Sequence, residues 1–258
     1  MNCYKSKNIV ITGASSGIGA QAARQIAALG ARVILLARTE EKLQQVAESI
    51  RKQGGEADIY PVDLSDSAAV EVVAQKIKKE IGIPDVLINN AGSGRWLSIS
   101  ETSADEAKKM IELPYLAAFN ITREFIEEMR ARGDGHIINL TSVASFLPTS
   151  QSIGYSAARY ALRGFSEALR SELLDSGVVV SLAVFGKVAS DYWEHNPGSE
   201  ERVPKATPFM PTLSTEDVAN ELIKVLKNKR RIVIKPGIFR LLFWLHRNFP
   251  DVVSKQMR

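Results

Sequence analysis

Short apolar runs alternate with amphipathic segments along most of this chain. The apolar runs predict buried strands at residues 8–12, 32–37, 57–62, 86–89, 135–141, 178–184 and 231–235. The segments between them carry apolar residues every three or four positions and predict helices at residues 18–29, 40–53, 66–81, 104–130, 154–176 and 215–227. Pro114 is expected to interrupt the long helical pattern at 104–130. Strict alternation of strand and helix predicts an α/β fold, a three-layer, doubly wound parallel sheet with helices on both faces. No linker or repeat divides the chain, so we expect one domain over residues 1–258.

The first predicted strand runs into a glycine-rich turn. Gly13, Gly17 and Gly19 follow Asn8–Thr12, and a helical pattern begins at once. Glycines let backbone approach a phosphate closely, and a helix N-terminus offers unpaired N–H groups. The turn therefore predicts a pyrophosphate site for a dinucleotide at Gly13, Gly17 and Gly19, with Ser16 and Ile18 as further cofactor contacts. The Ser15 hydroxyl is expected to add a contact to a 2′-phosphate of the cofactor.

Two other interpretations of the turn stay open. It is also compatible with a glycine-rich turn of any α/β protein. In addition, Gly13–Gly17 matches GxSxG, the nucleophile elbow of serine hydrolases, with Ser15 as the nucleophile. The hydrolase hypothesis is disfavoured because an elbow normally follows several strands, and this turn follows the first.

The end of the second predicted strand indicates the type of cofactor. An acidic residue there would bind the adenosine ribose and repel a 2′-phosphate. This chain has Ala37 and Arg38 instead, which favours NADP(H) over NAD(H) because a guanidinium grips phosphate in a bidentate way. The alternative is a solvated arginine at a strand end. Asp63, after the third strand, is placed to accept from the adenine amino group.

Further motifs make the chain resemble the short-chain dehydrogenase/reductase family from Lys7 to Lys235. They are the glycine turn, Val62-Asp63-Leu64, Asn89-Asn90-Ala91-Gly92, and Ser142 with Tyr155 thirteen residues later. The resemblance implies a Rossmann fold and hydride transfer between NAD(P) and a carbonyl or alcohol. It also implies cofactor contacts from Leu64, Asn90, Ala91, Gly92, Tyr155, Arg159, Gly186 and Val188, with the residue at position 159 contacting the nicotinamide ribose.

The resemblance assigns catalysis to Tyr155 as proton donor, with Ser142 holding the substrate oxygen. A phenol is a weak acid at neutral pH, and a neighbouring cation stabilises its phenolate. The family has a lysine four residues after the tyrosine, and this chain has Arg159, which keeps the charge but cannot release a proton.

Three further positions depart from the family pattern. The asparagine of the active-site relay falls on Pro114, the Pro-Gly pair after the sixth strand reads Phe185-Gly186, and Ser190 stands where threonine is usual. Two interpretations follow: an enzyme with a modified proton relay, which the intact Tyr155 and Ser142 favour, or a cofactor-binding regulator that has lost turnover.

The resemblance to the family also implies that residues 186–212 form the substrate loop. Tyr192, Trp193, Phe209, Met210, Trp96 and Phe146 are expected to line an apolar pocket, which favours a lipophilic substrate. Beyond the last strand, residues 237–258 form an apolar segment whose richest part, 238–249, is too short to span a bilayer. We expect it to cover the pocket, join a homo-oligomer or lie on a membrane surface.

Composition narrows the remaining classes of function. The net charge is only +4 and basic residues form no stripe with aromatics, so we expect no nucleic-acid partner. His136, His195 and His246 lie far apart, so no metal site is expected. The single cysteine, Cys3, cannot form an internal disulfide, and the first residues show no signal-peptide pattern. We therefore expect a cytoplasmic protein, with membrane association as an option.

Overall fold

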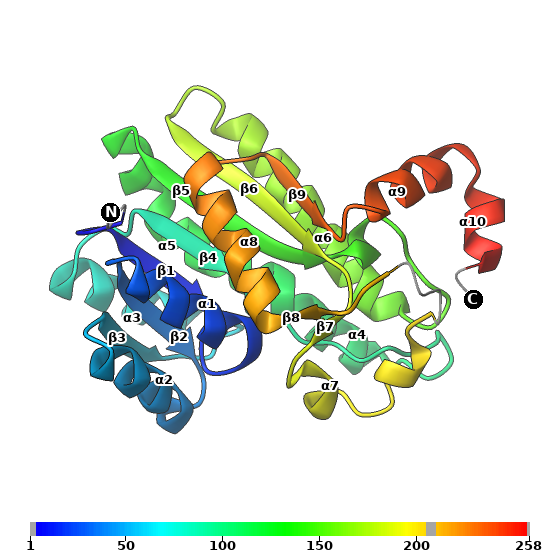
Figure 1. Ribbon diagram of the computed structural model, residues 1–258, viewed down its shortest axis with the longest axis horizontal. Helices are drawn as coiled ribbons and strands as arrows, with labels where there is room; N and C mark the ends of the chain where they lie inside the picture. The colour runs from blue at the N-terminus through cyan, green and yellow to red at the C-terminus, as the bar shows by residue number, and fades with distance from the viewer. Residues whose placement is uncertain (1–3, 205–209, 257–258) are drawn as a thin grey trace.

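A parallel sheet of seven strands forms the centre of the computed structural model, which describes residues 4–204 and 210–256. The strand order is β3-β2-β1-β4-β5-β6-β9 (Figure 1). These strands are β1 (Asn8–Thr12), β2 (Arg32–Ala37), β3 (Glu56–Pro61), β4 (Val86–Asn89), β5 (Gly135–Ser142), β6 (Val178–Phe185) and β9 (Ile232–Lys235). Every pairing in the sheet is parallel, so the predicted α/β fold and its seven strands are confirmed.

Helices cover both faces of the sheet, as the doubly wound prediction requires. The helices that connect or follow the strands are α1 (Gly17–Ala28), α2 (Glu40–Lys52), α3 (Ser67–Glu80), α5 (Ala117–Arg132), α6 (Ile153–Glu172) and α8 (Thr215–Asn228). The apolar sides of α1, α2 and α8 pack on one face, and those of α3, α5 and α6 pack on the other. The result is a three-layer Rossmann arrangement.

Successive residues of each strand point to opposite faces of the sheet. In β1, Ile9 and Ile11 pack with α1, whereas Val10 packs with α3 and α5, and all three side chains are fully buried. A strand covered on both sides needs apolar residues at every position. This is why the strands appear in the sequence as continuous apolar runs.

The long helical pattern before β5 is interrupted at the expected place. It divides into α4 (Ala104–Ile111), a π-helical turn at Glu112–Leu116, and α5. Leu113 leaves helical geometry there, with φ −126° and ψ 114°. Pro114 follows it and lacks the N–H that a regular helix would use, so the predicted interruption is confirmed.

The structure adds short elements that the periodicity did not predict. Residues within the expected substrate loop form β7 (Val188–Ala189), α7 (Tyr192–His195) and a 3₁₀ turn at Glu200–Arg202, and β7 pairs with β8 (Leu213–Ser214). The apolar C-terminal segment forms α9 (Phe239–Asn248) and α10 (Pro250–Gln256), which stand at one end of the molecule, away from the sheet (Figure 1). Each of these elements is too short to give a clear period.

A buried histidine in the sheet gives the fold a pH dependence. His136 lies on β5 with 2% of its surface exposed, and its Nε2 is 2.8 Å from the Ser181 hydroxyl. Burial is the main cause that lowers the pKa of His136 to about 4, with repulsion from Lys229 next and Asp134 opposing it. The folded protein therefore keeps this imidazole neutral at pH values where an exposed histidine is protonated.

We expect the free energy of unfolding to fall as the pH drops from about 6.5 to about 4. In this window the unfolded chain binds a proton that folded His136 excludes, at a cost of up to ~3 kcal/mol at the acid end. Urea unfolding across this range should show a shallower pH slope for His136→Gln than for the parent. The exposed His195→Gln serves as control and should keep the parental slope. A parental slope in His136→Gln would contradict the assignment.

Candidate active site

A cavity of about 860 Å³ opens at the carboxyl ends of the parallel strands. Its lining comes from the turn after β1, the ends of β2 and β3, the segment after β4, the end of β5, the start of α6 and the loop after β6. The strand order reverses between β1 and β4, and open α/β sheets bind ligands at such a switch point. The volume is in the usual range for cofactor and small-molecule sites.

The glycine turn is packed so tightly against the segment after β4 that side chains are excluded. Gly13 has φ +65°, and a Cβ there would lie 2.9 Å from the Ala91 Cα. A Cβ on Gly19 would lie 2.2 Å from the Gly13 carbonyl oxygen. The Thr12 hydroxyl accepts hydrogen bonds from the amides of Asn90 and Ala91, both at 3.0 Å. These contacts fix two cavity walls against each other.

The N-terminus of α1 opens into the cavity with its donors unused. Ser16 is the N-cap residue and makes no side-chain capping bond, and the first turn contains no acidic residue. Ser15, Ser16, Gly17 and Ile18 line the cavity here, whereas Gly19 lies behind the turn. Free N–H groups at the positive end of a helix fit a phosphate. The residues present therefore fit the pyrophosphate of a dinucleotide.

Basic side chains line the cavity beside the end of β2. Arg38 and Lys42 are exposed there, and Ala37 is the last residue of β2. Lys42 lies on α2, four residues after Arg38. It was not predicted as a site residue, although the spacing of the two cations was visible in the sequence. Asp63 faces the same end, and its Oδ1 accepts from the Ser65 amide and hydroxyl at 3.0 and 2.7 Å. The Ser65 amide is the main cause that lowers the pKa of Asp63, and Arg38 contributes.

The other end of the cavity holds Tyr155 inside a cluster of rings. Tyr155, near the start of α6, is 7% exposed. Its ring centroid is 5.4 Å from the ring of Trp96 and 6.2 Å from that of Tyr192. The Tyr192 hydroxyl donates to the Gly94 carbonyl, and burial raises its pKa, so it stays neutral. The aromatic walls exclude water from around the Tyr155 phenol.

Arg159 lies one helical turn after Tyr155 and stacks on it. The guanidinium carbon is 4.8 Å from the Tyr155 ring centroid, within cation–π range. The guanidinium also occupies the space above Gly92, where a Cβ would lie 2.8 Å from one of its nitrogens. Only 8% of Arg159 is exposed, and its Nε has no hydrogen-bond partner. Among the described residues no carboxylate lies within 4 Å of this cation.

Ser142 ends β5 in the same part of the cavity. Its Oγ accepts from the Ala144 amide at 3.2 Å and donates to no group in the described part of the chain. The hydroxyl proton is therefore free for a ligand oxygen. Ser142, Tyr155 and Arg159 all line the cavity, so the structure brings the three predicted catalytic residues together.

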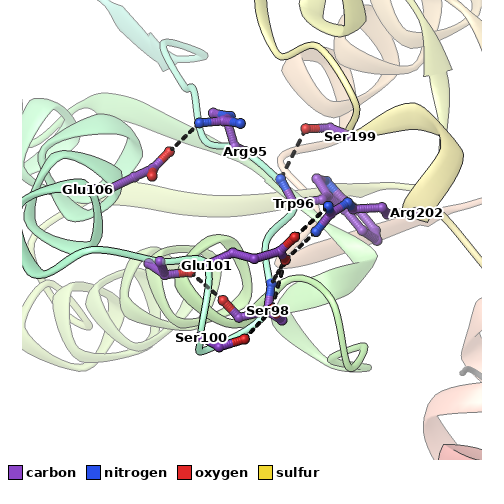
Figure 2. Close-up of polar contacts among 9 residues, drawn as sticks. Arg95, Trp96, Ser98, Ser100, Glu101, Glu106, Ser199 and Arg202 are labelled. Carbon is purple, nitrogen blue, oxygen red and sulfur yellow. Dashed lines mark hydrogen bonds and ion pairs between the residues drawn. The ribbon is translucent and has the colours of Figure 1, made fainter.

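The expected substrate loop makes direct hydrogen bonds to the segment after β4. Figure 2 shows Arg202 reaching Glu101, with hydrogen bonds of 2.5 and 2.8 Å. The amide of Trp96 donates to the Ser199 hydroxyl at 3.0 Å. Pairing with Arg202 is the main cause that lowers the pKa of Glu101. Together with the bond from Tyr192 to Gly94, these contacts hold the loop as a cover over Tyr155.

Most residues predicted for the apolar pocket line the cavity, but one does not. Trp96, Tyr192, Trp193 and Met210 are lining residues, and Phe209 lies outside the described residues. Phe146 was predicted to line the pocket and instead stacks on Phe243 of α9, with centroids 4.6 Å apart. The prediction was wrong because α9 provides a competing aromatic surface that the sequence did not place.

The remaining predicted positions fall on the cavity wall as well. Arg38, Asp63, Leu64, Asn90, Ala91, Gly92, Gly186, Val188 and Ser190 all line it. Leu113, rather than Pro114, faces the cavity from the π-helical turn. The serine-hydrolase alternative finds no support, because no hydrogen bond joins Ser15 to a histidine in residues 4–204 and 210–256.

Comparisons with known proteins agree with this geometry. The family model described as short chain dehydrogenase matches residues 7–200. A fatty acyl-CoA reductase of Acinetobacter baylyi is 32% identical over 96% of this chain and 82% of its own length. An uncharacterised oxidoreductase of Mycobacterium bovis is 41% identical over 69% of this chain, which spans about half (53%) of that relative. The relatives named here give no support to the alternative of a regulator without turnover.

Solved structures show the same fold with nicotinamide cofactors. A metagenomic short-chain oxidoreductase in complex with NADP has a TM-score of 0.74 and 31% identity, over 90% of this chain and 97% of that one. A short chain dehydrogenase/reductase from Burkholderia phymatum in complex with NAD has a TM-score of 0.85 and 24% identity, over 96% and 95% of the two chains. The fold thus occurs with either cofactor.

Residues 4–204 and 210–256 contain neither a membrane-spanning helix nor a metal-binding cluster. No helix there is both long and apolar enough to cross a membrane. No group of three or more histidine, cysteine or acidic side chains is arranged to hold a metal ion.

Proposed function

Because this chain belongs to the short-chain dehydrogenase/reductase family of oxidoreductases, we propose that it transfers hydride between NADP(H) and the carbonyl or alcohol of a lipophilic substrate. The observation that carries the proposal is the buried, unpaired Arg159 guanidinium stacked on Tyr155 beside Ser142. An isolated buried charge is costly, so such a cation is expected where a ligand supplies the missing acceptors.

Each of the three residues has a separate task in this proposal. Tyr155 donates the proton to the carbonyl oxygen, and the free Ser142 hydroxyl holds that oxygen in place. Arg159 stabilises negative charge on the phenolate and donates hydrogen bonds toward the nicotinamide ribose. A bound nicotinamide cofactor supplies the hydride. Because Arg159 keeps its proton, the proton that Tyr155 gives up returns by another route than this side chain.

Different parts of the cavity wall would bind different parts of the cofactor. The glycine turn and the N-terminus of α1 would hold the pyrophosphate. Arg38 and Lys42 would hold the 2′-phosphate, and Asp63 has an Oδ2 that accepts no bond within the described chain and is free for the adenine. The residues at the two ends therefore favour NADP(H) and a carbonyl site near Tyr155.

The substrate class follows from the aromatic walls around Tyr155. Trp96, Tyr192 and Trp193 give this end of the cavity an apolar lining. The Acinetobacter relative is named for reduction of fatty acyl-CoA, which is consistent with a long acyl chain. We propose an aldehyde, ketone or alcohol with a long alkyl or cyclic apolar group.

The function is tested by the consumption of NADPH with a panel of carbonyl compounds, using parent and Arg159 variants. We expect Arg159→Lys to keep kcat equal to or above that of the parent, because an ammonium retains the charge and adds a dissociable proton. Arg159→Met should lower kcat by about 10²-fold and weaken NADPH binding, since it removes the cation that faces Tyr155.

Arg163→Met is the matched control for the Arg159 variants. Arg163 lies one turn further along α6 and also stacks on a ring, 3.8 Å from the Phe146 centroid, but it does not line the cavity. The Arg163→Met variant should therefore keep the kcat of the parent. Equal turnover in Arg159→Met and parent would show that the cation has no part in the reaction. NADPH binding without turnover in the parent, across the panel, would overturn the proposed activity.

A further inference from the structure

The C-terminal helices α9 and α10 form an arm that is anchored to the rim of the cavity. Phe239, at the start of α9, packs so closely on Gly186 that a Cβ there would lie 3.0 Å from its ring. Phe243 stacks on Phe146, and Val253 of α10 packs with Leu147. Phe239 and Leu147 also line the cavity. The start of α9 is therefore part of the cavity wall.

The outer side of the arm exposes large apolar side chains. Ile238, Leu241, Trp244, Phe249 and Val252, the arm's apolar face, are between 38% and 63% exposed. This is a high density for fifteen consecutive residues, since no other stretch of that length in the described chain has more than two exposed large apolar side chains. Concentrated apolar surface of this kind marks an interaction site.

Cations flank this apolar face. Arg240 and Arg247 are exposed and seven residues apart, so they lie on one side of α9, next to Leu241 and Trp244. Lys255 adds a third exposed positive charge on α10. Asp251 is the only acidic residue in 238–256, and none of these cations has a carboxylate within 4 Å in the described chain. The outer side of the arm is therefore both apolar and positively charged.

This combination matches an anionic lipid surface. A short amphipathic helix with Trp and Leu on one side and arginines beside them lies in the interface of a bilayer, where acyl chains receive the apolar groups and headgroups receive the cations. A second copy of the chain matches less well, because a two-fold contact would bring the same cations together. We propose that α9 and α10 dock on the surface of an anionic membrane.

Docking in this way would place the apolar end of the cavity beside the lipid. Phe239 and Leu147 connect the arm to the cavity lining, and Figure 1 shows the arm at the end of the molecule, clear of the helices that cover the sheet. A lipophilic substrate would then enter from the membrane side. This last consequence rests on the proposed function, whereas docking itself does not.

Sedimentation with lipid vesicles tests the docking without any need for turnover. The parent should sediment with vesicles of phosphatidylcholine mixed with phosphatidylglycerol, and about tenfold less with phosphatidylcholine alone. Leu241→Ser/Trp244→Ser should lose about tenfold or more in affinity for the mixed vesicles. Arg240→Glu/Arg247→Glu should lose a similar factor, and parental binding should weaken at high salt.

Matched variants separate docking from general effects. Val72→Ser/Leu174→Ser removes two exposed apolar groups elsewhere, and Lys52→Glu/Arg123→Glu makes the same change of net charge away from the arm. Both should bind the mixed vesicles like the parent. Trp244 should also give a blue shift in fluorescence with these vesicles, absent in Trp244→Phe.

Two results would overturn the proposal. One is a parent protein that fails to sediment with the mixed vesicles. If that parent is a dimer and Leu241→Ser/Trp244→Ser makes it monomeric, the arm binds a second copy of the chain instead of a membrane. The other is an equal loss of vesicle affinity in Lys52→Glu/Arg123→Glu and in Arg240→Glu/Arg247→Glu. It would show that the vesicles respond to the net charge of the protein and not to the cations of the arm. Unchanged NADPH affinity in the arm variants would show that they are folded.

Discussion

Replacing Tyr155 with phenylalanine should lower kcat by about 10³-fold and leave the affinity for NADPH nearly unchanged. The substitution removes only the hydroxyl. The ring contacts to Trp96, at 5.4 Å, and to the Arg159 guanidinium, at 4.8 Å, remain available to phenylalanine. The cavity should therefore keep its shape and its cofactor site. The proton donor would be lost, and steady-state consumption of NADPH would report it directly.

Tyr160→Phe is the control for this substitution. Tyr160 lies on the same helix, is 39% exposed and does not line the cavity, so its loss of a hydroxyl should not alter kcat. Circular dichroism and NADPH binding would verify that both variants fold. Turnover in Tyr155→Phe at the parental rate would rule out the phenol as proton donor and leave the fold assignment intact.

The sequence was sufficient where local pattern decides structure. The seven strands were predicted within about one residue at each end, because strands covered on both faces must be continuously apolar. The glycine turn was recognisable because the positive φ of Gly13 and the absence of space at Gly19 leave no other residue type. Of the predicted cofactor positions, Gly19 alone lies off the cavity wall.

Contacts between distant segments could not be predicted in the same way. The pair Glu101 and Arg202 joins residues about a hundred positions apart, and neither forms part of a periodic segment. Phe146 was expected to line the apolar pocket, but stacking on Phe243 decided its place. In both cases the side chain could pack on several surfaces of similar composition, and tertiary packing decides which of them it contacts.

The expected homo-oligomer, the cytoplasmic location and the boundaries of one domain stay predictions. Oligomeric state and location depend on contacts with other molecules. The outer side of the arm illustrates this limit, because its residues have the same composition as buried ones. They are exposed because Phe239, Phe243 and Val253 face inward and leave the other apolar side chains of the arm on the outer side.

The parent should bind NADPH more tightly than NADH, and Arg38→Asp should erase or invert this preference. Two exposed cations, Arg38 and Lys42, line the cavity at the end of β2, where a carboxylate would repel a 2′-phosphate. A charge-assisted hydrogen bond to phosphate contributes roughly 1.5–3 kcal/mol, which corresponds to about 10–100-fold in affinity. Titration calorimetry with both cofactors measures the ratio of dissociation constants.

Lys42→Glu should reduce the same ratio by a smaller factor, because a lysine presents a point charge without the bidentate geometry of arginine. The two substitutions should be non-additive, since both side chains would contact one phosphate. Lys52→Glu, at the far end of α2, makes the same charge change away from the cavity and should keep the parental ratio. The preference should also weaken as salt is added, because both cations are exposed. Equal affinities in the parent, or an unchanged ratio in Arg38→Asp, would show that Arg38 is a solvated side chain and that the choice of cofactor is made elsewhere.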